Sequence, residues 1–396
     1  MEDGPMNREK ENRRIISIFA VASFLNDFGS DIIYPVWPLF VTSFSGVDML
    51  ILGFIDGLGD AIVSISQAIS GYLSDKFGKR KIFIWSGYVF GSLSRVGYAL
   101  SKTWLWLIPF KILDRSGKMR GAPRDAMVAD ASTDENRGRN FGLLRAMDNL
   151  GAVCGIITSI LLLSFLGYQN LFLLAALPSL IGASLVFILI KERRTEAIYR
   201  GLSLKDLDIN FQLFLLLSSI FALGNFSYSF LLVYSKNFGF EMAFTPALYL
   251  IFTVVASLMS LPFGRAADKF GRKPILTLAF LFFGLMCLGF IFVNSLFLII
   301  LLFVLYGLYR AALEPVQKTF ISELSPTRYR ASTMGAFQMI TGLISLPAGI
   351  IAGLLWESIG PWAPFSFSLS LSIVSLILLV FIKEEFRNVK IFFCGC

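Results

Sequence analysis

Acidic and basic side chains occur inside otherwise apolar stretches of this 396-residue chain, and their types and depth suit proton chemistry. Asp27 and Asp31 lie one helical turn apart and therefore share one face of a helix. A charge at the centre of a membrane-spanning helix costs at least about 2.5–3.5 kcal/mol, so it is a functional candidate by default. We expect a polar cavity with a proton-coupling site, formed near mid-span by Asp27, Asp31, Asp60, Asp114 and Arg115 and nearer one membrane face by Arg145.

Proton uptake and release follow from the environment of such carboxylates. Burial in a low-dielectric cavity disfavours the charged carboxylate, and a neighbouring base favours it again. Moving the base away during a conformational change would therefore make the carboxylate capture a proton. We predict this behaviour for Asp27 and Asp31, with Arg115 as the base. The alternative for any single pair, above all Arg145 with Asp148, is a static ion pair that fixes helix packing.

The composition excludes most other chemistry. The chain has no His, which removes imidazole metal sites, His proton relays and Ser-His or Cys-His nucleophile pairs. Cys154 and Cys287 lie in apolar segments, so the four Cys define no disulfide framework, and we expect Cys394 and Cys396 to be reduced. No phosphate-binding loop of the Walker type is present, which excludes ATP-driven pumping within this chain. We expect no metal site, no cofactor and no enzyme activity.

The elements that carry these residues are long apolar segments. Hydrophobic residues make up 56% of the chain, charged residues only 16%, and the mean hydropathy is +0.71. A helix that spans a bilayer, together with its loop, takes about 33 residues, so the chain has room for about twelve spans. The sequence therefore predicts an all-α polytopic membrane protein with segments near 15–43, 49–72, 82–101, 103–125, 141–166, 169–190, 211–234, 244–264, 275–293, 295–317, 334–356 and 361–382.

Basic residues fall on one side of these spans. One set of loops carries nearly all the Lys and Arg near the helix ends, whereas the other set offers only Lys102 and Lys236. Because cytoplasmic loops are enriched in Lys and Arg, we predict that both termini are cytoplasmic. The net charge of +8 then reflects membrane orientation rather than nucleic-acid binding. The polar stretch 191–210 is predicted to be a cytoplasmic linker between six-span halves at 1–190 and 211–396.

An internal repeat supports the division into two halves. GYLSDKFGKRK at 71–81 and GRAADKFGRKP at 264–274 share a pattern, with Asp75 and Asp268 related by an offset of 193 residues. The same offset relates Asp130 to Glu323 and Arg137 to Arg330. Two motifs in one register indicate duplicated units, which are typical of transporters that rock around a central site.

The first copy of this motif resembles the signature loop of the major facilitator superfamily, and its degenerate second copy is also expected there. NDFGSDIIYPVWPLF (26–40) and LDRSGKMRGAPRDAMVAD (113–130) look like a subgroup of prokaryotic members known only as general transporters. The resemblance covers nearly the whole chain. It implies a twelve-helix fold of two six-helix pseudo-repeats and says almost nothing about the substrate.

The resemblance also implies a role for the charged loops. It suggests that two clusters latch the cytoplasmic side in the outward-open state: Gly71, Asp75, Gly78, Lys79, Asp130 and Arg137 in the first half, and Asp268, Arg272, Glu323 and Arg330 in the second. Gly71 would permit a close helix approach and Gly78 a tight turn, and Asp130 would pair with Lys79. The alternative is a positive-inside anchor with no gating role.

Together these features predict a secondary transporter of the cell membrane. We expect proton-coupled efflux of a small solute by alternating access, carried out by a monomer in the lipid bilayer. The alternative within transport is a proton-coupled uptake symporter for an anionic or organic solute, since Lys111, Arg115 and Arg145 would suit an anion. A membrane-embedded transferase is disfavoured because the acids spread over five helices. A receptor or sensor would need a soluble domain, for which the chain has no room.

Overall fold

The part of the chain that the structure describes is helical. The computed structural model describes residues 5–133, 136–192, 208–236, 245–325 and 330–384, and no strand occurs among them. Most of the predicted linker, together with Cys394 and Cys396, lies outside these described residues.

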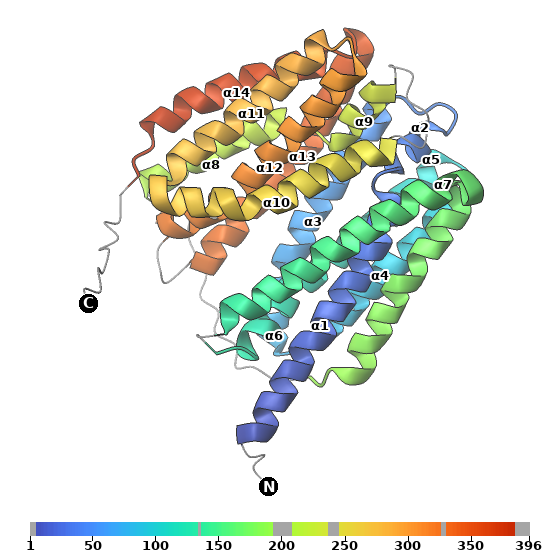
Figure 1. The fold of residues 1–396 in the computed structure, drawn as a ribbon, viewed down its shortest axis with the longest axis vertical. Coiled ribbons are helices and arrows are strands. Elements are labelled where there is room, and N and C mark those ends of the chain that lie inside the picture. The colour runs from blue at the N-terminus through green and yellow to red at the C-terminus, as the bar shows by residue number, and fades with distance from the viewer. Residues whose placement is uncertain (1–4, 134–135, 193–207, 237–244, 326–329, 385–396) are drawn as a thin grey trace.

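Six crossings form the first half of the molecule (Figure 1). The last two belong to one long element, α7 (Arg137–Leu189). Within it Gly167, at φ 65° and ψ 178°, leaves the helical conformation, and the chain reverses there. The elements of the first half are α1 (Pro5–Ile33), α2 (Trp37–Thr42), α3 (Met49–Phe77), α4 (Lys81–Leu100), α5 (Trp104–Ser116), the 3₁₀ turn η1 (Gly117–Arg120), α6 (Gly121–Asp130) and α7 (Arg137–Leu189).

The second half repeats this arrangement with six more crossings. Its first crossing is broken between two helices, as the first crossing of the chain is between α1 and α2. The elements of the second half are α8 (Ile209–Gly224), α9 (Tyr228–Lys236), α10 (Thr245–Phe270), α11 (Arg272–Phe292), α12 (Leu296–Leu324), α13 (Arg330–Ser358) and α14 (Ala363–Phe381). The predicted twelve-helix fold of two six-helix bundles is confirmed.

Hydropathy alone finds fewer crossings than the fold contains. Nine stretches of the described residues are long and apolar enough to cross a bilayer, and one of them, Asn140–Leu189, crosses twice. Helix α4 and the broken crossing α5–η1–α6 fall outside this set. Both carry buried charges, Arg95 in α4 and Lys111 in α5, which lower the local hydropathy. Two crossings with buried charges thus escape a search by hydropathy, whereas those with Asp31 and Asp56 are still found.

The two halves meet at one end of the molecule and separate toward the other (Figure 1). We call the end that holds residues 36–49 and 225–236 the closed end. We call the end at which α3, α6, α10 and α12 terminate the open end. At the closed end, α2 contacts α9, and Glu357 at the end of α13 accepts a hydrogen bond of 2.9 Å from the backbone N–H of Met49.

Helices α3 and α13 carry most of the contact between the halves. Gly53 and Gly349 face each other so closely that a Cβ atom on either would collide with the carbonyl group of the other. The contacts run from Met49 and Glu357 to Ser64 and Gly342, and beyond that point the helices diverge toward the open end. The halves are therefore farther apart at the open end than at the closed end.

Candidate functional site

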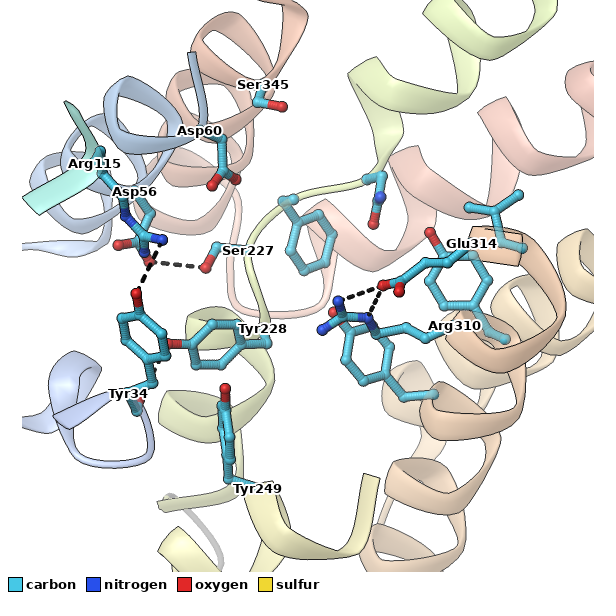
Figure 2. A pocket seen from close by; sticks show the side chains of 15 residues that line it. Tyr34, Asp56, Asp60, Arg115, Ser227, Tyr228, Tyr249, Arg310, Glu314 and Ser345 are labelled. Carbon is cyan, nitrogen blue, oxygen red and sulfur yellow. Dashed lines mark hydrogen bonds and ion pairs between the residues drawn. The ribbon is translucent and has the colours of Figure 1, made fainter. Parts of the chain in front are cut away.

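The cavity lies between the two halves and measures about 370 Å³, within the size range of sites for small molecules. Figure 2 shows residues from both halves pointing into it. Five tyrosines, five charged residues and a few smaller side chains line it: Tyr34, Asp56, Asp60, Arg115, Asn225, Phe226, Ser227, Tyr228, Tyr249, Tyr306, Tyr309, Arg310, Leu313, Glu314 and Ser345.

Two broken crossings bring their chain into this space. After α1 ends at Ile33, Pro35 interrupts the regular backbone, because proline lacks the N–H that would continue the helix. Helix α8 ends at Gly224, and residues 225–227 are not helical. Side chains of both breaks face each other, and the Tyr228 hydroxyl donates a hydrogen bond of 3.1 Å to the carbonyl oxygen of Tyr34. Irregular backbone at membrane depth is tolerated where it lines a cavity.

Asp56 is the most heavily bonded carboxylate of the site. One of its oxygens accepts hydrogen bonds from Lys111 Nζ and Trp37 Nε1, each of 2.9 Å. Its other oxygen accepts from the hydroxyls of Ser227, at 2.8 Å, and Ser229. Lys111 is 2% exposed and also lies 4.0 Å from the centre of the Trp37 ring. This buried network joins the halves at the closed end, since the two serines belong to the second half.

Arg115 and Asp60 point into the cavity from neighbouring helices of the first half (Figure 2). The Arg115 guanidinium lies 5.1 Å from the centre of the Tyr34 ring and 3.7 Å from the Asp114 carboxylate. Asp60 is exposed to the cavity, and its carboxylate makes no hydrogen bond or ion pair with the residues that the structure describes. The predicted mid-span group is thus divided between a paired Asp114 and an unpaired Asp60.

Asp27 and Asp31 have different partners from the one that the sequence predicted. Asp27 lies 4.0 Å from Arg120 and accepts a hydrogen bond of 2.8 Å from Asn26. Asp31 is 9% exposed and accepts a bond of 3.3 Å from the hydroxyl of Tyr249, which belongs to the second half. The structure therefore pairs Asp27 with Arg120 rather than with Arg115, and a coupling role for Arg115 stays a prediction. The 3₁₀ turn η1 changes the face that this crossing presents, so Arg120 faces α1 while Arg115 faces the cavity.

The static ion pair of Arg145 with Asp148, weighed as an alternative, is not formed in this structure. Asp148 lies 3.8 Å from Arg124 of α6, which donates a hydrogen bond of 2.6 Å to Ser23 of α1, whereas Arg145 is exposed. Arg310 lines the cavity and is ion-paired with Glu314 one helical turn away on α12.

The signature loop forms an ion pair within the first half. Gly78 has φ 61°, as predicted for a tight turn. A Cβ atom added at Gly71 would lie 3.6 Å from Ala122 of α6, an ordinary contact, so no close helix approach requires glycine there. Arg80, not the predicted Lys79, is the partner of Asp130, and Lys79 is exposed. The difference lies in where the next helix begins: α11 begins directly after Gly271, whereas two residues, Lys79 and Arg80, separate Gly78 from the start of α4.

The second copy of the loop pairs in the same way. Arg272 contacts Asp268 at 2.6 Å and Glu323 at 3.0 Å. In both halves a carboxylate after the last helix accepts bonds from the first backbone N–H groups of the third crossing: Glu192 from Arg80 and Lys81, and Glu384 from Arg272 and Lys273. The side chains of Asp75, Arg137 and Arg330 lie outside the described residues. The latch therefore stays a prediction.

Sequence reasoning missed several residues of the site. It left out Arg95, which is 2% exposed and donates to Ser30, Ser179 and the carbonyl oxygens of Asn26 and Ala175. It also gave Asp56 no place among the coupling residues and found no signal for the tyrosines. A buried Arg in an apolar span was readable from the sequence. The tyrosines were not, because they come from four separate helices or breaks. Among the described residues, no group of three His, Cys, Asp or Glu lies together to hold a metal ion.

Comparison with known proteins decides the family. The model of the Major Facilitator Superfamily matches residues 19–204 and 213–391. The chain belongs to this superfamily. An uncharacterized MFS-type transporter of Methanocaldococcus jannaschii is 37% identical over 394 residues, which cover 95% of this chain and 98% of that protein. The prediction of a membrane transporter, rather than an enzyme, is confirmed.

More distant relatives and solved structures extend this result. The multidrug resistance protein MdtH of Aeromonas salmonicida is 24% identical, over 91% of this chain and 93% of its own. A D-xylose-proton symporter matches with a TM-score of 0.77 and 16% identity, over 94% of this chain and 98% of that one. The nucleoside transporter NupG matches with a TM-score of 0.71 and 17% identity, over 92% and 97%. These two structures share the fold of this transporter.

Proposed function

We propose that this transporter exports a small solute in exchange for protons by alternating access. The observation that carries the proposal is the way its halves meet around the cavity. Tyr228, Ser227 and Ser229 of the second half bond to the first half at the closed end, while the open end is separated. Breaking these bonds and closing the open end would expose the same cavity to the other side of the membrane.

Asp31 is the proposed link between proton binding and this movement, with Asp27 one turn away. The Tyr249 hydroxyl donates to Asp31 across the two halves. A hydrogen bond to an ionised carboxylate is roughly twice as strong as one between neutral groups. Protonation of Asp31 would therefore weaken a contact that holds the closed end together. Of the other predicted residues, Asp60 and Arg115 are assigned to the substrate cavity, and Asp114, which is buried and does not line the cavity, is assigned to holding Arg115. Arg145 keeps only its position at the open end.

The direction of transport is proposed from the relatives. The MdtH proteins are multidrug resistance proteins by name, which favours export. Proton coupling is supported by the buried carboxylates and by the fold shared with a D-xylose-proton symporter. The likeness to a symporter also supports the alternative, which is proton-coupled uptake of an anionic or organic solute. The cavity residues Arg115 and Arg310 would favour an anion.

The orientation in the membrane is proposed from the charge of the loops. The basic residues gather at the open end, so we place the open end and both termini in the cytoplasm of a plasma-membrane protein. The cavity then faces the cytoplasm, which suits the loading of an exported solute. The loop clusters around Asp130 and Glu323 would latch the open end after it closes, and we propose that a single chain suffices for transport. Reporter fusions at Asn210 and Gly167 should give opposite signals. Equal signals would contradict the topology.

Proteoliposomes test the coupling. Purified transporter is reconstituted with an imposed pH gradient, and uptake or release of candidate solutes, chosen by a thermal-shift screen, is followed over time. We expect solute movement against its gradient while the pH gradient lasts, and none after a protonophore collapses it. If transport ignores the pH gradient, proton coupling is wrong, and a facilitator or a sodium-coupled carrier replaces it.

A further inference from the structure

The two walls of the cavity differ in chemistry. The first half contributes Asp60, whose carboxylate reaches into the open space in Figure 2. The second half faces it with four tyrosines, Tyr228, Tyr249, Tyr306 and Tyr309. A single carboxylate therefore stands opposite a wall of aromatic rings.

Asp60 is the one acid of the cavity lining without a bonded partner among the described residues. Asp56 is bonded to Lys111, and Glu314 is ion-paired with Arg310. Arg115, the basic neighbour of Asp60, is shared between the Asp114 carboxylate and the Tyr34 ring. Closing the open end over a ligand would remove water from Asp60. A desolvated carboxylate requires a positive partner, because its hydration is worth several kcal/mol.

Most hydroxyls of the second-half tyrosines have partners, Arg310 beside Tyr306 among them, but their ring faces remain available to such a cation. They pack against one another, with ring centres of Tyr228 and Tyr249 at 5.1 Å and of Tyr306 and Tyr309 at 5.8 Å. The first half uses its aromatic faces to hold cations: Lys111 over Trp37, Arg115 over Tyr34 and Arg120 over Tyr88. Within the described part of the chain, no Lys or Arg lies over the rings of the four tyrosines in this way.

We propose that the cavity binds an organic monocation, with its positive charge against Asp60 and its apolar body against the tyrosine wall. The negative face of an aromatic ring attracts a cation, and aromatic cages are the usual site for quaternary ammonium groups. A volume of about 370 Å³ limits the ligand to a small molecule. This inference rests on the proposed transport function and names the substrate class of that same cavity.

Binding to the purified full-length transporter in detergent tests the charge requirement. Three probes share a phenyl body and differ in charge: benzyltrimethylammonium, phenylacetamide and phenylacetate. We expect only the cation to raise the melting temperature and to give a titratable heat in calorimetry. Tighter binding of phenylacetate would overturn the proposal, as would equal binding of all three. If none of the probes binds, the proposal also fails. That result would mean that the Asp60 carboxylate is satisfied by water, or by Arg310 after it turns away from Glu314.

Variants then test the two walls. Asp60→Asn should weaken benzyltrimethylammonium binding at least tenfold, whereas Glu9→Gln, which removes a carboxylate from an exposed pair with Arg13, should leave it unchanged. Tyr228→Phe and Tyr228→Leu both remove the hydroxyl bond to Tyr34, so their difference isolates the aromatic face. We expect Tyr228→Leu to bind several-fold more weakly than Tyr228→Phe.

The outcomes separate this inference from the transport function. Cation binding by Asp60→Asn equal to that of the unmodified protein would overturn the proposed class. If Asp60→Asn does not fold, the substrate class is still tested by the three probes on the unmodified protein and by the variants Tyr228→Phe and Tyr228→Leu. pH-driven flux in proteoliposomes is measured separately. Flux of a neutral or anionic solute, without cation binding, would keep the transporter and reject the cation.

Discussion

The two halves of this transporter share a fold but fill it with different chemistry. Among the described residues, every charged side chain that is buried lies in the first half: Asp31, Asp56, Arg80, Arg95, Lys111, Asp114 and Arg120. Buried polar groups of the second half are serines and threonines, and its core is rich in phenylalanine. Bonds to buried charges are directional and costly to leave unmade, whereas aromatic packing tolerates small shifts. The comparison teaches that one half is held by specific bonds and the other by packing.

The largest expected effect tests whether the buried charge organises the first half. Gly29→Ala would place a Cβ atom against the Arg95 guanidinium and the Ala175 carbonyl oxygen, so the bonds of Arg95 must break. Since disrupting a buried charged network costs about 3–5 kcal/mol, we expect little folded protein. Fluorescence-detected size exclusion and the melting temperature measure this.

Two other glycines serve as controls for that substitution. Gly91→Ala, also beside Arg95, would meet its neighbours at 3.7 Å or more, and Gly284→Ala in the second half at 3.5 Å or more. Both lie inside helices, where alanine is favoured over glycine by about 1 kcal/mol. Normal or raised stability is expected for both. A well-folded Gly29→Ala protein would contradict the assignment of a rigid first half.

A smaller effect is expected at the network that joins the halves. Asp56→Asn leaves Lys111 buried without a counter-charge and should lower stability by about 3 kcal/mol, with partial recovery in the double variant with Lys111→Met. Removing the hydroxyls of Ser227 and Ser229 costs only about 1 kcal/mol each. A variant that lacks both of these hydroxyls should instead favour opening of the closed end. Longer distances between spin labels on either side of that end would show the opening. Unchanged distances would show that these bonds do not hold that end.

The coupling prediction concerns one bond between the halves. Asp31→Asn keeps the size of the side chain but cannot titrate, so it should spare folding and abolish accumulation against a gradient while downhill exchange survives better. Tyr249→Phe removes only the donor and should weaken coupling less. Proteoliposomes with and without a pH gradient separate these cases. If both Asp27→Asn and Asp31→Asn keep pH-driven transport, α1 is structural, and Asp60 or Asp114 becomes the candidate.

The smallest effects on stability are expected at the loop clusters. Asp268 is 71% exposed on its side chain, and exposed ion pairs contribute about 0–1 kcal/mol, so Asp268→Asn should hardly change the melting temperature. On transport, we expect Asp75→Asn to be sharply defective and Asp268→Asn milder, because the first copy of the motif is more complete. Normal transport by Asp75→Asn would return both loops to the anchor interpretation.

The fold was predictable from the sequence because its signals are additive. Hydropathy, loop charge and the repeat at an offset of 193 residues are each read from many positions, so one misread residue does not change the predicted fold. The cavity was predictable only in part. Asp60, Asp114 and Arg115 were found because a charge in an apolar span is rare. Their partners were not, because a single 3₁₀ turn, as at η1, or a helix that begins two residues later, as after Lys79 and Arg80, changes which side chains meet.

The facing glycines Gly53 and Gly349 have a mechanical consequence. With no side chains interlocked between them, this contact is a fulcrum about which the two bundles can tilt. Helix α3 continues 24 residues beyond Gly53 to Phe77, a lever arm of about 36 Å at 1.5 Å per residue. A tilt of about 10° at the fulcrum would carry the far tip by about 6 Å. The same tilt would move Ser64, where α3 still contacts Gly342, by about 3 Å, so the contacts between Gly53 and Ser64 have to shift when the cavity is sealed or unsealed.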